Sequence, residues 1–312
     1  MNEQQQRLIE DLVGEFQGEI RADPLALAMY STDASLYEIR PLAVAFPRSV
    51  EDVRLLAVYS AEKHLELVPR GAGTGLAGAA IGAGIIVDFS RHMTAIESID
   101  AETVHVQPGV VCDNLNRELK KQGRYFAPDP SNSAVTTIGG MVGVDAAGSH
   151  AARVGSTRDH VMSAEMILAG GDTFEVTTLL RSSLQRTGTG LDSLSRAEID
   201  LPEPSAGKDR NRERLSRLVK ILSDNAALIE RHQPPMIRNC SGYMLRGVLQ
   251  ESHLRLERLI TGSEGTLGLL TSLVLHTSPL PEHRGVALIL FDSMDAALDA
   301  AEQAAPYDPT AC

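Results

Sequence analysis

The chain has no tryptophan, and aromatic residues make up only 4% of its 312 positions. Surfaces that stack nucleic-acid bases need aromatic side chains, so this class of binding surface is not expected. Basic residues are also in deficit, because 29 Lys and Arg stand against 41 Asp and Glu, for a net charge of −12. Phosphate backbones are bound by basic surfaces. Both deficits argue against nucleic acid as a partner.

Long apolar runs and closely spaced cysteines are missing as well. No run of about 18 apolar residues occurs, so no transmembrane segment is expected. Residues 1–6 are polar and lack the layout of a signal peptide. We therefore expect a cytoplasmic protein, with peripheral attachment of the full-length protein at the inner membrane as the alternative. Cys112, Cys240 and Cys312 form no Cys-x-x-Cys pair and are expected to be reduced thiols.

Glycine, by contrast, is abundant and clustered. Residues 70–78 contain four glycines and follow an apolar run at 65–68 that predicts a strand. Backbone amides without side chains can close around a phosphate. The pattern at 73–78 matches the Rossmann fingerprint, which needs a helix next and an acidic residue about 20 positions later. A predicted strand at 85–89 follows too soon and Asp88 comes too early, so NAD is not expected.

The remaining pattern predicts mixed helices and strands. Helices are expected at 3–18, from Ser49 onward, at 111–121, from Thr137 onward, at 209–231 and at 294–304, and further strands at 43–47, 103–107, 161–168, 173–177, 269–276 and 285–291. The glycines at 170–171 predict a hairpin between two of these strands. The basic stretch within 181–236 is interpreted as a solvated insertion, with a docking surface as the alternative.

Three more glycine-rich turns lie at 137–143, 148–155 and 262–268. Four such turns in one chain indicate a long ligand with many backbone contacts, as a flavin dinucleotide would be. Taken in order, the motifs at 69–78, 128–131, 137–140, 155–161 and 262–268 resemble the p-cresol methylhydroxylase/vanillyl-alcohol oxidase superfamily of FAD-linked oxidases. The segment 238–245 resembles its D-2-hydroxyacid dehydrogenase branch, which includes glycolate-oxidase-subunit-like, D-lactate and D-2-hydroxyglutarate dehydrogenases. The resemblance covers roughly residues 20–306.

The resemblance implies an α+β fold with a two-subdomain FAD-binding module. The N-terminal helix and first subdomain would occupy 1–125. The second would occupy 126–280, with a helical insertion at about 181–236. Residues 281–312 would begin an α+β cap domain for the substrate, whose remainder would lie beyond Cys312.

The resemblance also implies FAD held without a covalent bond, because Thr74 stands where some members carry the attaching histidine. Residues 71–78 would wrap the pyrophosphate, 128–131 and 137–145 would follow the ribityl chain and flavin, 155–161 would reach the adenine, and 262–268 would support the ring. The residues expected to bind the cofactor are Arg70, Gly71, Ala72, Gly73, Thr74, Gly75, Leu76, Gly78, Pro130, Ser131, Thr137, Gly139, Gly140, Gly143, Asp145, Gly148, Gly155, Val161 and Gly265. Related sequences often carry Asn at the positions of Val144 and Asp145, and a carboxylate near FAD phosphates is unfavourable.

The implied activity is FAD-dependent oxidation of a D-2-hydroxy acid, such as D-lactate, glycolate or D-2-hydroxyglutarate, by hydride transfer to FAD. A quinone, a cytochrome or an electron-transfer protein would accept the electrons. The alternative is an FAD- or nucleotide-binding subunit of an electron-transfer complex without its own catalysis.

No residue stands out as the catalytic base. The candidates are Arg238, Tyr243 and His150, each of which can equally be a structural or surface residue. Glu264 is expected to brace its turn rather than act as a base. No metal site is predicted in this chain, and any iron–sulfur cluster or divalent metal would lie beyond Cys312.

Overall fold

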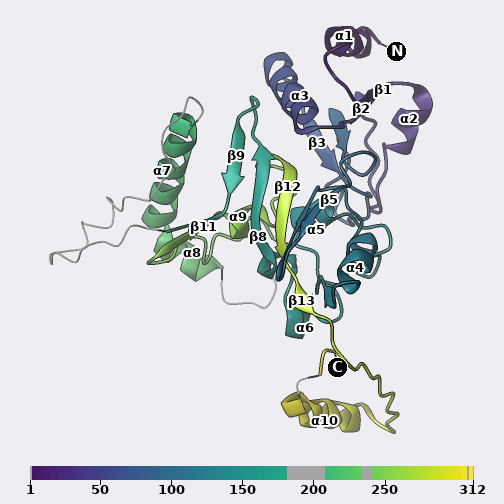
Figure 1. The fold of residues 1–312 in the computed structure, drawn as a ribbon, viewed down its shortest axis with the longest axis vertical. Helices are drawn as coiled ribbons and strands as arrows, with labels where there is room; N and C mark the ends of the chain where they lie inside the picture. Colours follow the sequence, from purple (N-terminus) through teal and green to yellow (C-terminus); the bar gives the residue numbers. More distant parts are fainter. Residues whose placement is uncertain (1, 181–207, 234–240, 308, 312) are drawn as a thin grey trace, which may run out of the picture.

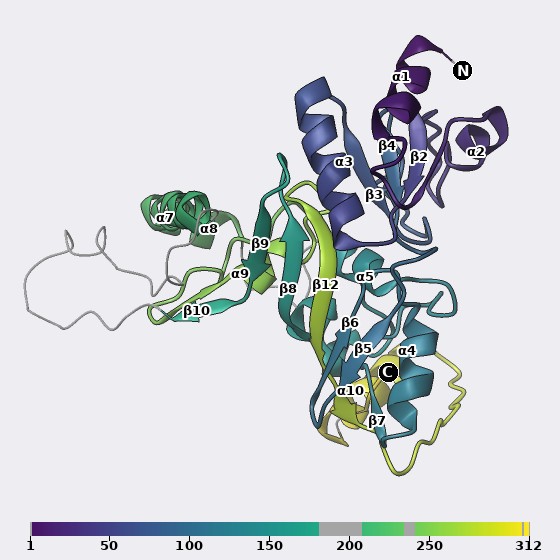
Figure 2. The same cartoon turned by 45° about the horizontal axis from the view of Figure 1, so that its top comes forward.

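The computed structural model describes residues 2–180, 208–233, 241–307 and 309–311. Figures 1 and 2 show the smaller N-terminal sheet with its helices at one end and the five-stranded sheet in the middle, and Figure 1 shows α10 set apart at the opposite end. The described helices and strands confirm the predicted α+β class.

The N-terminal sheet has the strand order β1-β2-β4-β3. Its strands are β1 (Glu19–Arg21), β2 (Ala43–Phe46), β3 (Leu67–Arg70) and β4 (Ile85–Asp88). β1 runs antiparallel to β2, whereas β4 is parallel to both of its neighbours. All residues of β2 and β4 are buried, as expected for parallel strands covered on both faces.

Two helices supply much of the core of this sheet. The helix α1 (Glu3–Leu12) buries Leu8 and Leu12, and α3 (Val50–Lys63) buries Val53 and Leu56. As predicted, Ser49 caps α3, because its hydroxyl accepts a hydrogen bond from the amide of Asp52 at 3.2 Å.

The helix predicted over 3–18 is shorter than expected. α1 ends at Leu12, and Gly14 follows with a φ of +86°, a left-handed conformation that a helix cannot continue through. Phe16 still reaches the core, with an exposed fraction of 9%. The helical spacing of Phe16 from the apolar residues of α1 therefore reflects a tertiary contact rather than another helical turn.

The five-stranded sheet is antiparallel, with the order β5-β6-β12-β8-β9. Its strands are β5 (Ile96–Ile99), β6 (Thr103–Val106), β8 (Val161–Ile167), β9 (Thr173–Val176) and β12 (Leu269–His276). β8 and β9 form the predicted hairpin. Because β5 and β6 pair within this sheet, the change of sheet falls between β4 and β5, whereas the predicted subdomain boundary lies near residue 125.

Shorter elements complete the described fold. They are α2 (Pro24–Met29), α4 (Cys112–Lys120), β7 (Arg124–Tyr125), α5 (Ile138–Val144), α6 (Ala151–Val154), the 3₁₀ turn Thr157–Asp159, β10 (Thr178–Leu180), α7 (Lys208–Asp224), α8 (Ala226–His232), β11 (His253–Arg255), α9 (Leu256–Ile260), β13 (Ser278–Pro279), α10 (Met294–Ala304) and the 3₁₀ turn Ala305–Tyr307. The helix predicted over 209–231 is two helices, because Asn225 leaves the helical conformation with a φ of −110°. Residues 181–207, which belong to the basic stretch interpreted as a solvated insertion, lie outside the described part of the chain.

The strand predicted at 285–291 is not formed. The segment pairs with no strand in the described residues, and Val286, Leu288 and Leu290 are each at least 87% exposed. A strand is stabilised by hydrogen bonds to a neighbour, so its apolar composition alone does not produce one. Within the described ranges, no helix is both long enough and apolar enough to cross a bilayer.

Candidate functional site

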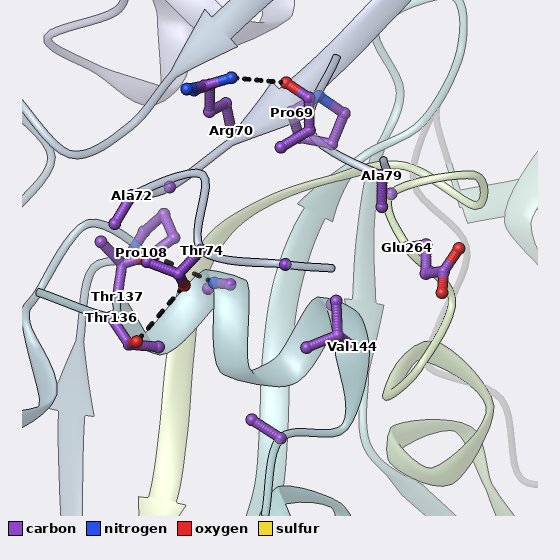
Figure 3. Close-up of a pocket in the computed structure, with 18 of the residues that line it drawn as sticks. Pro69, Arg70, Ala72, Thr74, Ala79, Pro108, Thr136, Thr137, Val144 and Glu264 are labelled. Atoms are coloured by element: carbon purple, nitrogen blue, oxygen red, sulfur yellow. Dashed lines mark hydrogen bonds between the residues drawn. The ribbon is translucent and has the colours of Figure 1, made fainter. Parts of the chain in front are cut away.

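A cavity of about 640 Å³ lies where the predicted motifs meet, a size typical of ligand sites. Figure 3 shows the glycine loop after β3, the turn before α5, α5 itself and the turn before β12 around it. The lining residues are Pro69, Arg70, Gly71, Ala72, Gly73, Thr74, Gly75, Leu76, Ala77, Ala79, Ala80, Phe89, Pro108, Pro130, Ser131, Asn132, Thr136, Thr137, Gly139, Gly140, Gly143, Val144, Ala146, Ala147, Met166, Ile260, Ser263, Glu264, Gly265, Gly268 and Leu270.

The glycine loop supplies backbone donors. It contains no helix, as the failed Rossmann pattern predicted, and none of the amides of residues 72–79 donates a hydrogen bond to another described group. The carbonyl of Gly73 accepts a hydrogen bond from the amide of Ala34 at 2.9 Å, which anchors the loop. A run of amides that the protein leaves unengaged beside a cavity suits an anionic ligand.

Arg70 fixes the loop from its base. Its Nη1 donates hydrogen bonds to the carbonyls of Thr32 at 2.9 Å and Ala80 at 3.1 Å. The guanidinium also lies 5.0 Å from the ring centroid of Tyr30, within cation–π range. Tyr30 in turn donates a hydrogen bond to Asp88, and burial together with this bond raises the pKa of the phenol. One face of Arg70 is therefore occupied by the protein.

The first amides of α5 are already satisfied. Ile138 donates to the carbonyl of Val110 at 2.8 Å, Gly139 donates to Pro108 at 2.7 Å, and Gly140 donates to the hydroxyl of Thr137 at 3.3 Å. An anion in the cavity therefore has the amides of the glycine loop available rather than these. The same contacts fasten α5 to the end of β6.

The last carbonyls of α5 bind the turn before β12. The amide of Gly262 donates to Val142, and that of Glu264 donates to Gly143, both at 2.8 Å. A helix leaves its final carbonyls without internal partners, and here the turn satisfies two of them. This pairing brings the motif at 262–268 beside the motif at 137–143, more than a hundred residues earlier in the chain.

Fourteen of the nineteen residues predicted to bind the cofactor line the cavity: Arg70, Gly71, Ala72, Gly73, Thr74, Gly75, Leu76, Pro130, Ser131, Thr137, Gly139, Gly140, Gly143 and Gly265. The other five, which are Gly78, Asp145, Gly148, Gly155 and Val161, do not. Gly78 and Gly155 each have a φ of +79°, at turns. A Cβ at Gly148 would lie 1.9 Å from the carbonyl oxygen of Asp129, so this glycine permits a close backbone approach.

Asp145 lies behind the cavity wall rather than in it. Its carboxylate approaches the guanidinium of Arg158 at 3.4 Å and accepts a hydrogen bond from the amide of the same residue at 2.9 Å. Both side chains are 3% exposed. Arg158 also donates to the carbonyl of Thr261 at 2.6 Å. Related sequences often carry Asn at position 145, and here the charge of the Asp145 carboxylate is neutralised by Arg158.

None of the described catalytic candidates lines the cavity. His150 pairs through Nδ1 with the carboxylate of Asp129, and its side chain is 43% exposed. The hydroxyl of Tyr243 shares a hydrogen bond with that of Thr266 at 2.7 Å. Arg238 lies outside the described residues. Glu264 lines the cavity, its amide holds the turn to the carbonyl of Gly143 at 2.8 Å, and its exposed carboxylate makes no hydrogen bond within the described ranges.

Sequence reasoning missed lining residues of two kinds. Asn132 and Thr136 flank predicted motifs, so extending each motif by one position would have found them. Met166 on β8 and Leu270 on β12 enter the cavity from neighbouring strands. No local signal separates these two from ordinary core residues, because only the pairing of the strands brings them together.

His160, behind the same region, makes stability depend on pH. Burial lowers its pKa below the ordinary value of 6.5, although the carbonyl of Val154 and the charge of Asp159 oppose the shift. The folded state therefore holds the neutral ring, while the unfolded state binds a proton as the pH falls through 6.5. We expect stability to decrease below this pH, by at most about 1.4 kcal/mol per pH unit from this group.

Thermal denaturation between pH 7.5 and 5 measures this effect. The wild-type melting temperature should fall more steeply than that of His160→Gln, which cannot be protonated. The matched control is His232→Gln, because His232 is exposed and its replacement should leave the slope unchanged. Equal slopes for the wild type and His160→Gln would contradict the prediction.

Residues 41–177 match a family model described as FAD binding domain. The matched segment includes the glycine loop, the turn before α5 and α5 itself. In this segment the chain is similar to an FAD binding domain. The match agrees with the resemblance that the glycine-rich motifs indicated, and it includes most of the residues that line the cavity.

Alignments with curated relatives cover most of this chain. It is 37% identical to the D-2-hydroxyglutarate dehydrogenase of Escherichia coli (strain K12), over 86% of this chain and 25% of that protein. It is 29% identical to glycolate oxidase subunit GlcD of Bacillus subtilis (strain 168), over 86% of this chain and 44% of that protein. A probable mitochondrial D-lactate dehydrogenase of Danio rerio is also 29% identical, over 88% of this chain and 43% of that protein. The chain thus spans about a quarter of the D-2-hydroxyglutarate dehydrogenase.

The fold is shared with a solved enzyme. The structure of an alkyldihydroxyacetonephosphate synthase superimposes with a TM-score of 0.64 and 19% sequence identity, covering 100% of this chain and 48% of that one. At this identity the likeness concerns the fold alone. It supports the assignment of an α+β fold.

Proposed function

We propose that this chain binds FAD without a covalent bond, as the FAD-binding part of a dehydrogenase that oxidises a D-2-hydroxy acid. The observation that carries the proposal is the cavity, which is lined by the glycine loop, by α5 and by the turn before β12, and beside which the amides of residues 72–79 donate no hydrogen bond to a described group. When bound, FAD supplies the hydride acceptor. The substrate class rests on the names of the relatives, which are D-2-hydroxyglutarate and D-lactate dehydrogenases and a glycolate oxidase subunit.

The cavity residues fit a dinucleotide. A Cβ built on Gly75 or on Gly143 meets no atom within 4 Å, so at both positions the absent side chain leaves open space in the lining. Arg70 is the only basic side chain among the described lining residues. The pyrophosphate would therefore be held mainly by backbone amides. The fourteen lining residues predicted from sequence are the proposed contacts of FAD as a whole. The contacts predicted for Gly78, Asp145, Gly148, Gly155 and Val161 stay predictions.

Non-covalent attachment is supported by the chemistry of the lining. Thr74 stands where some members of the superfamily carry the attaching histidine, and its hydroxyl lies 3.4 Å from that of Thr136. The described lining residues include no His, Cys or Tyr, the side chains able to form a bond to the flavin. Cys112 is buried outside the lining, and burial raises the pKa of its thiol to about 12.

A second candidate is an FAD-binding subunit without its own catalysis, in an electron-transfer complex. It is favoured by one observation, because neither His150 nor Tyr243 lines the cavity. In both cases we propose a quinone, a cytochrome or an electron-transfer protein as electron acceptor, and a cytoplasmic location.

The purified chain tests the proposal. We expect visible flavin absorbance from bound FAD, and complete release of the yellow colour by acid precipitation. Colour that stays with the precipitate would refute non-covalent binding. A colourless chain that also fails to bind added FAD would refute the proposal itself. Bleaching on anaerobic addition of D-lactate, D-2-hydroxyglutarate or glycolate would exclude the second candidate, since bleaching requires a competent substrate site. Because no described catalytic candidate lines the cavity, we expect no bleaching from this chain alone.

A further inference from the structure

A serine, a histidine and a glutamate are joined by hydrogen bonds on the five-stranded sheet, away from the cofactor cavity. Nε2 of His105 shares a hydrogen bond with the hydroxyl of Ser272, and Nδ1 of the same ring lies 3.2 Å from the carboxylate of Glu97. None of these three residues lines the cavity. They come from the neighbouring strands β12, β6 and β5, which Figure 2 shows side by side.

The alternation of the strands places this cluster on the face of the sheet opposite the core. Val104 and Val106 are fully buried, whereas the side chain of His105 between them is 39% exposed. In the same way, Leu273 is buried and its neighbour Ser272 is half-buried. Successive side chains of a strand point to opposite faces, so His105 and Ser272 lie on the solvent side. Small molecules in solution can therefore reach the cluster.

Two shifts in strand register bring the serine and the glutamate to the histidine. The pairing of β5 with β6 shifts between Ile96 and Ser98, so Glu97 stands outside the paired residues. The pairing of β12 with β8 shifts between Leu270 and Ser272. Such bulges re-aim side chains and are over-represented next to active sites. Here both shifts serve the same imidazole ring.

The contacts on the two ring nitrogens assign their roles. A carboxylate accepts hydrogen bonds and donates none, so in the neutral ring Nδ1 carries the proton toward Glu97 and Nε2 keeps a lone pair for the hydroxyl of Ser272. A serine hydroxyl becomes a competent nucleophile when a base within hydrogen-bonding reach takes its proton, and a third group orients that base. His105 and Glu97 stand in these two relations to Ser272.

The charges around the hydroxyl limit the molecules that can react with it. Glu165 is paired with Ser272 across the ladder to β8, and Glu175 is paired with Glu165 on β9. Directly opposed residues share a face, so these two carboxylates and that of Glu97 lie on the face of the hydroxyl. They repel an anion and favour a neutral or cationic molecule. On a partly exposed sheet face the base has to do most of the activation, so the reacting ester needs a good leaving group.

We propose that Ser272 is a nucleophile that is acylated by neutral or cationic activated esters, with His105 as its base and Glu97 as the residue that positions the base. Oγ of Ser272 forms a bond to the acyl carbon while its proton passes to Nε2 of His105. The bond from the acyl carbon to the leaving oxygen breaks, and the leaving group departs with the electron pair and takes up that proton. The product is an ester of Ser272, formed without a change of oxidation state. This site is independent of FAD binding.

Acetylation by p-nitrophenyl acetate tests the proposal, with mass spectrometry of the peptide that contains Ser272 as the measurement. The wild-type chain should be acetylated at this residue. His105→Gln should react at least about a hundredfold more slowly and Glu97→Gln about tenfold more slowly. Both replaced side chains are partly exposed, so melting temperatures close to that of the wild type would show that the fold is intact. No acetyl group on Ser272, or equal rates in the wild type and His105→Gln, would overturn the proposal.

A matched serine and a matched ester serve as controls. Ser163 lies on the same face, because Val274 is paired with His105 on one side and with Ser163 on the other. Ser163→Ala should therefore leave the rate at Ser272 unchanged. The ester 4-acetoxy-3-nitrobenzenesulfonate transfers the same acetyl group but carries a negative charge, so it should react more slowly than p-nitrophenyl acetate. Equal rates for the two esters would overturn the assigned class of acyl donor.

Discussion

Replacing Gly143 by alanine should stabilise the unliganded chain and at the same time weaken its binding of FAD about tenfold. Gly143 lies within α5, where alanine is favoured over glycine by about 0.5–1 kcal/mol. A Cβ at this position meets no protein atom within 4 Å, so the fold accommodates it. The methyl group would instead enter the cavity, where crowding a fitted ligand costs about 1–3 kcal/mol.

Opposite signs for stability and affinity distinguish this effect from general damage to the fold. Thermal denaturation without FAD and equilibrium dialysis with FAD measure the two quantities on the same samples. Gly285→Ala is the matched control, because a Cβ there also meets nothing within 4 Å but lies outside the cavity. Wild-type affinity in Gly143→Ala would show that FAD does not approach this face of α5.

The second large effect is expected at the buried ion pair behind the cavity. Asp145→Asn should reduce the free energy of unfolding by about 3–5 kcal/mol, because it leaves the guanidinium of Arg158 buried without its carboxylate. Asparagine suits the left-handed conformation of position 145, where φ is +51°, so backbone strain does not add to the loss. Urea denaturation of the unliganded chain measures the change.

A double-mutant cycle separates the charge pair from simple loss of packing. Arg158→Met removes the buried cation but keeps an apolar stem of similar length. If the pair is coupled, Asp145→Asn combined with Arg158→Met should be more stable than the sum of the two single losses implies, by at least about 1 kcal/mol. Additive losses would mean that the two charges do not depend on each other.

Motifs with a local cause were predictable from sequence. The glycine loop and the turn at 262–268 need backbone conformations that their own glycines supply. The segment at 137–143 needs small residues because Gly139 packs closely against Pro108, and all three segments contribute to the cavity lining. The cap at Ser49 and the hairpin of β8 and β9 depend on neighbours within a few residues. Interactions of this kind can be predicted from a single sequence because both partners lie within a few residues of each other.

Features with a distant cause were not predictable. The apolar segment at 285–291 does not become a strand, because no described strand lies beside it. Asp145 is predicted to contact the cofactor, and only the fold shows that its carboxylate pairs with Arg158, 13 positions along the chain. Glu264 is expected to brace its turn, and only the fold shows that this residue also lines the cavity.

The sequence by itself determined the kind of ligand site, because runs of small residues leave amides accessible wherever they occur. It also determined the α+β composition through its periodicity. The tertiary structure alone decided which amides remain free. The first amides of α5 are taken by Pro108 and Val110, and its last carbonyls by the turn at 262–265, while the amides of residues 72–79 find no partner in the described chain. Hydrogen bonding between segments far apart in sequence makes this selection, and it leaves the glycine loop as the donor surface of the cavity.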